Sequence, residues 1–287
     1  MFPHQIKPNI TGNLTPTLLG TIVVPGNPLD PHTRDIIDAI ETAGGFAMPA
    51  EQKPRIDTFV RAGYTSGDVI KRFNLQIWAN AAANAIDWVT LGSGSFHDSI
   101  THAAGYTKSD GIDGRFDMGA SLHGVGATGN SNHIGCLVAL AASQTGYFMS
   151  AQATSSTVSL NKYSSSAYLS RNNSGGFNAH HSPLSYANAV GVFMSNRPTF
   201  DGFNSSVRNA SGVSRVASGA DNSATHNNTS NMNGFCENNS GAYHTFSNAG
   251  IGVFFMGVGI PDIAAEDAQS LAIANLWSDC SSLPLPG

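Results

Sequence analysis

The most informative stretch of the sequence is IGVFFMGV, at residues 251–258. It is continuously apolar, and its valine, isoleucine and phenylalanine residues favour extended backbone. A strand that is covered on both of its faces has this composition, because neither side contacts water. Its two glycines allow a neighbouring element to approach the backbone closely. The stretch therefore predicts a buried strand.

Shorter strand-like runs extend outward from this stretch over residues 86–260. They lie at residues 86–91, 115–118, 133–140, 146–153, 158–160, 167–171, 190–195, 206–208 and 213–216. Clusters of Gly, Ser and Asn separate them, at spacings of about ten residues. Such spacing is typical of a sandwich or barrel and not of βαβ units. The predicted fold class is mainly β, an antiparallel β-sandwich.

Helical patterns precede the predicted sandwich. A first helix has isoleucines at positions 36, 37 and 40 and stops at a pair of glycines, residues 44–45. A second helix is expected at about residues 50–62, with Ile56, Phe59 and Val60 on one stripe, and it packs on the first as a helical hairpin. Ser66 is suited to cap a third, short helix that runs through Phe73.

A further helix is expected to close the fold at residues 264–277. Asp262, Glu266 and Asp267 favour its start through the helix macrodipole. The side chains expected to face inward are Ala268, Leu271, Ala272 and Leu276. The chain is thus divided into an arm at residues 1–32, a helical segment at 33–79, and a β-sandwich with its closing helix at 80–287.

The arm contains six prolines and two short apolar pieces, Leu18-Leu19 and Ile22-Val23-Val24. Prolines favour extended backbone, so the arm is suited to lie along a partner. The alternative is a disordered terminus, because such a segment rarely orders alone.

Composition restricts the classes of function. Of the 287 residues only 11% are charged, and the net charge is −5, so we expect no nucleic-acid binding. The first residues lack a secretory signal, and the longest apolar stretch is too short to span a bilayer, so we expect a soluble chain without membrane insertion. Cys136, Cys236 and Cys280 are isolated and odd in number, which favours buried free thiols and a reducing site of synthesis.

Three segments resemble the concanavalin A-like (laminin-G-like) jelly-roll modules of virion proteins from tailed bacteriophages. The segments are AIDW at residues 85–88 leading into GSGSF at 92–96, SDGIDGRFDMG at 109–119, and FS at 246–247 followed by residues 250–258 and the closing helix. The resemblance covers about residues 80–280. It implies a spike, fibre, baseplate part or capsid decoration, often trimeric, and several such modules bind polysaccharide.

Residues 163–196 carry side chains suited to a sugar. Aromatic rings stack on pyranose faces, and Asn, His and Arg donate hydrogen bonds to hydroxyls. The candidate carbohydrate-binding residues are Tyr163, Tyr168, Arg171, His180, His181 and Tyr186. The alternative is that they are solvated loop residues.

Motifs for catalysis or metal binding are weak. A sandwich-fold glycosidase needs two neighbouring carboxylates, but the chain has only four glutamates, and Glu237 has no acidic neighbour within fifteen positions. Asp110, Asp113 and Asp117 cluster without the spacing of an EF-hand, which favours an acidic turn and leaves calcium binding open. The ten histidines lack zinc-site spacing. We therefore predict no enzyme activity, no metal and no cofactor.

The leading hypothesis is a non-enzymatic virion surface protein, made in a bacterial host, in which the arm contacts other virion proteins and the sandwich binds a host surface polysaccharide. A homotrimer is expected. The alternatives are a purely structural decoration or baseplate component and a glycan-cleaving enzyme.

Overall fold

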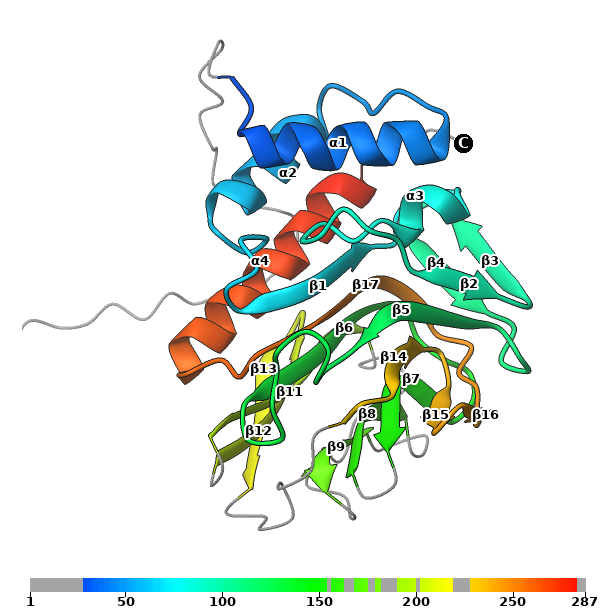
Figure 1. The fold of residues 1–287 in the computed structure, drawn as a ribbon, viewed down its shortest axis with the longest axis vertical. Coiled ribbons are helices and arrows are strands. Elements are labelled where there is room, and N and C mark those ends of the chain that lie inside the picture. The colour runs from blue at the N-terminus through cyan, green and yellow to red at the C-terminus, as the bar shows by residue number, and fades with distance from the viewer. Residues whose placement is uncertain are drawn as a thin grey trace, which may run out of the picture.

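The computed structural model describes residues 28–153, 156–162, 168–174, 179–181, 190–199, 202–218 and 228–282. Two sheets pack face to face, and helices cover the outer face of one of them (Figure 1). Every strand pair but one is antiparallel among those described, the exception being a single parallel pairing between β7 and β15. The predicted mainly β, antiparallel sandwich with a C-terminal helix is confirmed.

The first sheet has eight strands. Seven follow one another in the order β13-β12-β11-β6-β17-β4-β3, and β1 pairs with the same edge of β17 as β4 does. Their bounds are β1 Ile70–Leu75, β3 Ile100–Ala103, β4 Tyr106–Ser109, β6 Asn132–Leu140, β11 Gly191–Thr199, β12 Gly202–Asn209, β13 Gly212–Ser218 and β17 Gly250–Gly257.

The second sheet has nine strands. The path is β10-β9-β8-β7-β14-β5-β2, and β15 and β16 form a hairpin beside β7. Their bounds are β2 Ser95–His97, β5 Arg115–Ser121, β7 Gly146–Ala153, β8 Ser156–Lys162, β9 Tyr168–Ser174, β10 Ala179–His181, β14 Asn231–Gly234, β15 Glu237–Asn239 and β16 Ala242–His244.

The buried apolar strand is β17, and all of its residues are buried. Phe254 and Met256 point into the core between the sheets, whereas Val253 and Phe255 point into a second core beneath the helices. At Gly252 a Cβ atom would lie 2.4 Å from Nε1 of Trp277, so only glycine allows this close approach of helix to strand. The prediction of a strand covered on both faces is confirmed.

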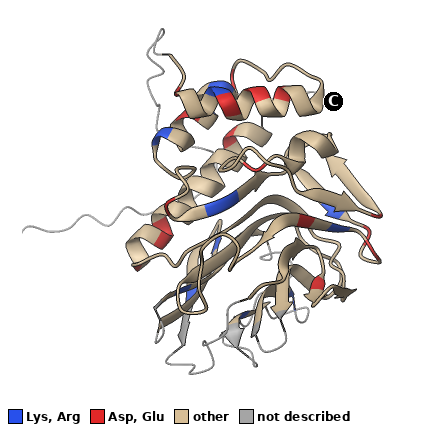
Figure 2. Cartoon of the chain, viewed as in Figure 1, with Lys and Arg blue, Asp and Glu red and all other residues tan. Residues whose placement is uncertain are grey.

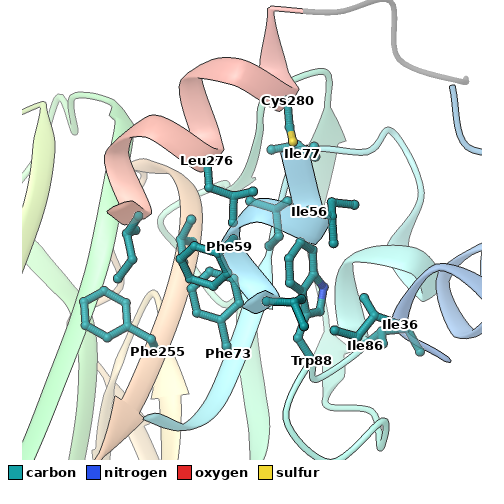
Figure 3. Packing of buried hydrophobic residues seen from close by; sticks show 14 of the residues in the cluster. Ile36, Ile56, Phe59, Phe73, Ile77, Ile86, Trp88, Phe255, Leu276 and Cys280 are labelled. Atoms are coloured by element: carbon teal, nitrogen blue, oxygen red, sulfur yellow. The ribbon is translucent and has the colours of Figure 1, made fainter. Parts of the chain in front are cut away.

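Four helices are described, with bounds α1 Pro31–Gly44, α2 Lys53–Arg61, α3 Ala81–Ala85 and α4 Ile263–Ser281. Asp57 on α2 accepts hydrogen bonds from the Asp30 backbone and the Thr33 hydroxyl, which joins α2 to the start of α1. The second core lies between these helices and the eight-stranded sheet, where Phe59, Phe73 and Trp88 pack against one another (Figure 3). The first two predicted helices are confirmed.

The predicted third helix is wrong, because Ile70–Leu75 is strand β1. The Ser66 hydroxyl does accept a hydrogen bond from the Asp68 backbone, as a cap would. Gly67, however, has φ +80°, and the chain then extends along β17. The strand predicted at residues 86–91 is also wrong: α3 precedes it, and Asp87 closes a turn by accepting from the Val89 backbone.

The inward face of the C-terminal helix is likewise corrected. Leu276 is buried as predicted, but Ala268 and Leu271 are exposed, and Ala272 is partly exposed. The buried residues of α4 are Glu266, Gln269, Ser270, Ile273, Leu276 and Cys280. The helix is therefore rotated so that polar side chains at its start face the sheet.

Candidate functional site

The structure places the predicted sugar-binding residues in different surroundings. Tyr168 is only 2% exposed, and its ring packs on Phe148 and Phe193 in the core between the sheets, so its role as a surface ligand is wrong. Its side chain lies inward because it alternates with Arg171 along β9. Tyr163 and Tyr186 lie outside the described residues, and His180 and His181 are described only as backbone of β10, the edge strand beside β9.

Arg171 is the predicted residue that the structure places beside other functional side chains. It pairs with Ser159 on the face of the nine-stranded sheet that points away from the core. Its positive charge lowers the pKa of Tyr147 on β7, although burial outweighs this effect. The outer face of the nine-stranded sheet therefore carries the candidate binding site.

Tyr147 and Glu237 form the centre of this face. The Tyr147 hydroxyl donates a hydrogen bond to the Glu237 carboxylate, and burial together with this carboxylate raises the pKa of Tyr147 to about 12. Tyr147 is thus a neutral donor at physiological pH. Phe148, its neighbour along β7, points into the core between the sheets, and Tyr147 itself is only 6% exposed, so it holds Glu237 without being open to solvent.

Arg115 on β5 forms a second group on the same face. Its Nη1 atom donates to Oδ2 of Asp98 at 2.6 Å, and the side chains are 19% and 47% exposed. The guanidinium carbon lies 4.2 Å from the centre of the Tyr243 ring, which is a cation–π contact. Arg115, Asp98 and Tyr243 therefore hold one another in a fixed arrangement.

The two groups are neighbours, because Tyr243 pairs with Asn238, the residue after Glu237, in the hairpin of β15 and β16. Arg115 and Glu237 both change the pKa of the buried Cys236 thiol, which burial raises to about 12, and Asp117 does so as well. The Asp117 carboxylate is held by the Gly119 backbone and by the Asn231 amide. We call the set Asp98, Arg115, Tyr243, Glu237, Tyr147 and Arg171 the polar strip.

The acidic cluster of the sequence forms turns. Oδ1 of Asp110 accepts from the backbone of Ile112 at 2.8 Å, and further backbone donors lower the pKa of this carboxyl, although burial acts in the opposite sense. Asp113 accepts from the Ser99 backbone. Within the described residues, no group of three or more His, Cys, Asp and Glu side chains could hold a metal ion.

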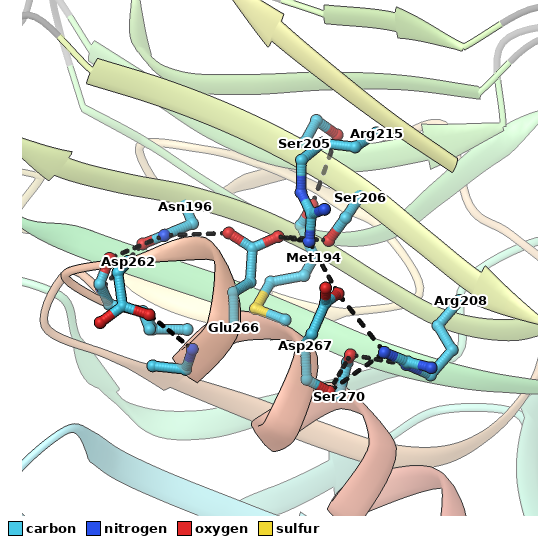
Figure 4. Close-up of polar contacts among 12 residues, drawn as sticks. Met194, Asn196, Ser205, Ser206, Arg208, Arg215, Asp262, Glu266, Asp267 and Ser270 are labelled. Carbon is cyan, nitrogen blue, oxygen red and sulfur yellow. Dashed lines mark hydrogen bonds and ion pairs between the residues drawn. The ribbon is translucent and has the colours of Figure 1, made fainter. Parts of the chain in front are cut away.

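A buried ionic network joins α4 to the eight-stranded sheet (Figure 4). Glu266 is 1% exposed and accepts hydrogen bonds from Ser206 at 2.7 Å, from Asn196 at 3.1 Å and from Arg215 at 3.4 Å. Asp267 shares Arg215, at 2.8 Å. Glu266 is thus sealed and neutralised between the helix and the sheet, whereas Asp267, with its side chain 39% exposed, lies at the edge of the network.

The three cysteines are free and buried, as predicted. Burial raises the pKa of each thiol, which keeps the sulfur protonated and unreactive. Within the described residues, no helix has the length and apolar character needed to span a membrane.

The predicted residues that the structure describes and the polar strip lie on the same sheet but share only Arg171. Arg115, Tyr243 and Glu237 were not among the predicted ligands, because Tyr243 and Glu237 lie on three-residue strands with no periodicity. One signal was available: alternation of polar Arg115 and Asp117 with apolar Phe116 and Met118 marks a strand with one outward polar face.

Comparison with known proteins identifies a fold and no family. No family model and no curated protein matches the sequence. A mutant of Trypanosoma rangeli sialidase displaying trans-sialidase activity is similar in structure over 81% of this chain, with a TM-score of 0.54 and 9% identity. The match covers 39% of the sialidase, so this chain spans about two fifths of that protein's length.

Two other solved structures have lower TM-scores. Domain 4 of the arabinanase AbnA from Geobacillus stearothermophilus, solved with arabinotriose, covers 70% of this chain and 98% of its own, at TM-score 0.43 and 10% identity. Tailspike protein 2 of Escherichia coli O157:H7 bacteriophage CAB120 covers 64% of this chain and 26% of its own, at TM-score 0.40 and 12% identity. The chain is thus similar in fold to part of a sialidase, and the likeness to concanavalin A-like phage modules stays a prediction.

Proposed function

We propose that this protein is a non-enzymatic glycan-binding protein whose binding surface is the outer face of the nine-stranded sheet. The observation that carries the proposal is the polar strip: aromatic, guanidinium and carboxylate groups fixed against one another on a sheet face on which no described helix packs. The similarity in fold to the sialidase supports the architecture alone.

The chemistry of the strip suits sugar hydroxyls. Asp98 and Glu237 accept hydrogen bonds, and Arg115 and the amide of Asn231 donate them. The Tyr243 ring adds an amphipathic surface that contacts the carbon–hydrogen face of a pyranose. Since these groups already hold one another in place, little conformational entropy is lost on binding.

The lack of catalysis is part of the proposal. Glycoside hydrolysis needs one carboxyl group that donates a proton and a second group that attacks or activates water. Glu266 is sealed under α4, Glu41 pairs with Lys53, and Glu237 is held by Tyr147. Asp117 is held by Asn231 and Gly119. These partners support binding in preference to proton transfer.

A second part of the proposal concerns where the protein acts. We infer a virion surface protein that attaches to a host polysaccharide, because the sequence resembles phage modules and has a proline-rich arm suited to contact other virion proteins. Labelled antibodies against this chain should decorate intact particles. Particles without the protein should adsorb poorly to host cells, whereas weakened particles with normal adsorption would favour the purely structural alternative.

A glycan array tests the binding itself. The full chain should bind at least one oligosaccharide, and Tyr243→Ala should weaken that binding about tenfold, since about 1.4 kcal/mol of contact energy is lost. Tyr243→Phe keeps the ring and should retain most of the affinity. Leu271→Ala, on the opposite side of the molecule, is the control. Failure of the full chain to bind any glycan would refute the proposal.

A further inference from the structure

We propose that the polar strip takes a neutral, hydroxyl-rich glycan and rejects anionic glycans such as sialylated or uronate-containing chains. The inference rests on the proposed function and narrows its ligand class. It follows from how the charges of the nine-stranded sheet are distributed and partnered.

The strip carries no excess of positive charge. Its cations are Arg115 and Arg171. Asp98 and Glu237 lie within the strip, and Asp117 lies beside it, which makes three carboxylates against two guanidinium groups. The described face therefore has one net negative charge.

Arg115, a partly exposed cation of the strip, is already partnered. Nη1 of Arg115 is 2.6 Å from Asp98, and its guanidinium lies on the Tyr243 ring. An anionic sugar would have to displace Asp98 or bind beside it, and both cost free energy. Sugar hydroxyls, in contrast, accept and donate hydrogen bonds around the existing pair without replacing it.

No other cation of the second half of the chain serves this face. Beyond Arg115 the sequence has only five Lys and Arg residues, one of which is Arg171. Lys162 is 4% exposed and donates to the Ala142 carbonyl, and Arg197 is fully buried. The remaining two, Arg208 and Arg215, bind Asp267 beneath α4 on the eight-stranded sheet.

Figure 2 shows the consequence for the whole sheet, whose described strands carry few charged residues of either sign. The groups that remain for a ligand are neutral, among them exposed Asn231, Ser95 and Asn239. Recognition through such groups depends weakly on ionic strength, because no counterions are exchanged.

The test compares two neutral polysaccharides, dextran and galactomannan, with two anionic ones, polysialic acid and alginate, in affinity electrophoresis of the full chain. We expect that a neutral polymer retards the chain. The size of this retardation should change less than about twofold between about 50 mM and about 500 mM salt. Binding of an anionic polymer, alone or equally with a neutral one, would overturn this inference and leave the proposed function standing. Absence of binding to all four and to the glycan array would refute both.

A charge variant sharpens the test. Asp98→Asn removes the carboxylate that neutralises Arg115, and Asn tolerates the φ of 60° found at this position. We expect Asp98→Asn to gain retardation by polysialic acid that the natural chain lacks, and this gain should disappear at high salt. Asp35→Asn, exposed on α1, changes the net charge equally and should gain none. Equal gains, or no gain in Asp98→Asn, would count against the proposal.

Discussion

The eight-stranded sheet buries its outer face beneath helices, whereas no described helix packs on the outer face of the nine-stranded sheet, where Asp98 and Asn231 are exposed. On the first, Leu137, Val192 and Val253 contribute to a large apolar core with α1, α2 and α4. On the second, Arg115 and Glu237 lie in a polar strip, and the only large core is on the inward side. One sheet therefore supports the structure on both faces, and the other carries the polar strip that we propose to bind a glycan.

The two faces also use charge differently. Glu266 is buried with Arg215, Ser206 and Asn196, so both of its carboxylate oxygens gain partners when they leave water. Asp98 is 47% exposed and stays in contact with solvent. The buried ion pair fixes the position of α4, while the exposed pair is weakened by water and salt.

The largest effect is expected from breaking the buried network. Glu266→Ala removes the buried carboxylate that accepts from Ser206 and Asn196, while Arg215 keeps Asp267 at 2.8 Å, so the free energy of unfolding, measured by urea denaturation, should fall by about 2–4 kcal/mol. Asp98→Asn breaks an exposed pair and should cost less than about 1 kcal/mol. Similar losses in the two variants would show that the two faces do not differ as described.

The two sides of α4 provide a matched pair. Leu276 is 4% exposed and packs in the second core, beneath the helices (Figure 3). Leu276→Ala should therefore lower the free energy of unfolding by about 2–5 kcal/mol. Leu271 is 47% exposed on the same helix, and Leu271→Ala should change stability by less than about 0.5 kcal/mol. A larger effect at Leu271 in thermal denaturation would contradict the rotation of the helix.

An effect that appears only in acid is expected at the contact between α4 and β6. His133 is fully buried: its Nδ1–H donates to the Val258 carbonyl, and its Nε2 accepts from the Gln269 amide at 3.3 Å. Burial lowers the pKa of His133 from 6.5 to about 4, although the Val258 carbonyl acts in the opposite sense. The folded state therefore favours the neutral ring.

The ring of His133 takes up a proton at higher pH in the unfolded chain than in the folded one. Its contribution to the free energy of unfolding is therefore fully present above pH 6.5 and is lost as the pH falls towards about 4. The loss should approach about 1.4 kcal/mol for each pH unit in that window. His102, whose pKa burial also lowers to about 4, adds to it. In the variant His133→Gln, the midpoint of urea denaturation should depend less steeply on pH than in the natural chain. An unchanged slope would contradict the attribution of this pH dependence to His133.

Strand β17 and the first two helices could be predicted from the sequence because their signals are local. Ile36, Ile37 and Ile40 mark one side of α1, and Gly45 takes φ +68° at its end. The short strands β2, β14, β15 and β16 could not, because three or four residues carry no periodicity. Of the polar strip, the sequence analysis named Arg171 alone, and its other five residues were not predicted.

The sequence by itself determined that the chain forms many short strands around one wholly apolar strand, with a surface of neutral polar groups. The hydrophobic period and the composition of a segment are local properties, so they can be determined without knowing which strand pairs with which. Tertiary structure alone decided that Ile70–Leu75 extends along β17, that Glu266 faces inward, and that Arg115 lies on Tyr243. Each of these depends on a partner far away in the sequence, whose pairing free energy outweighs the local preference.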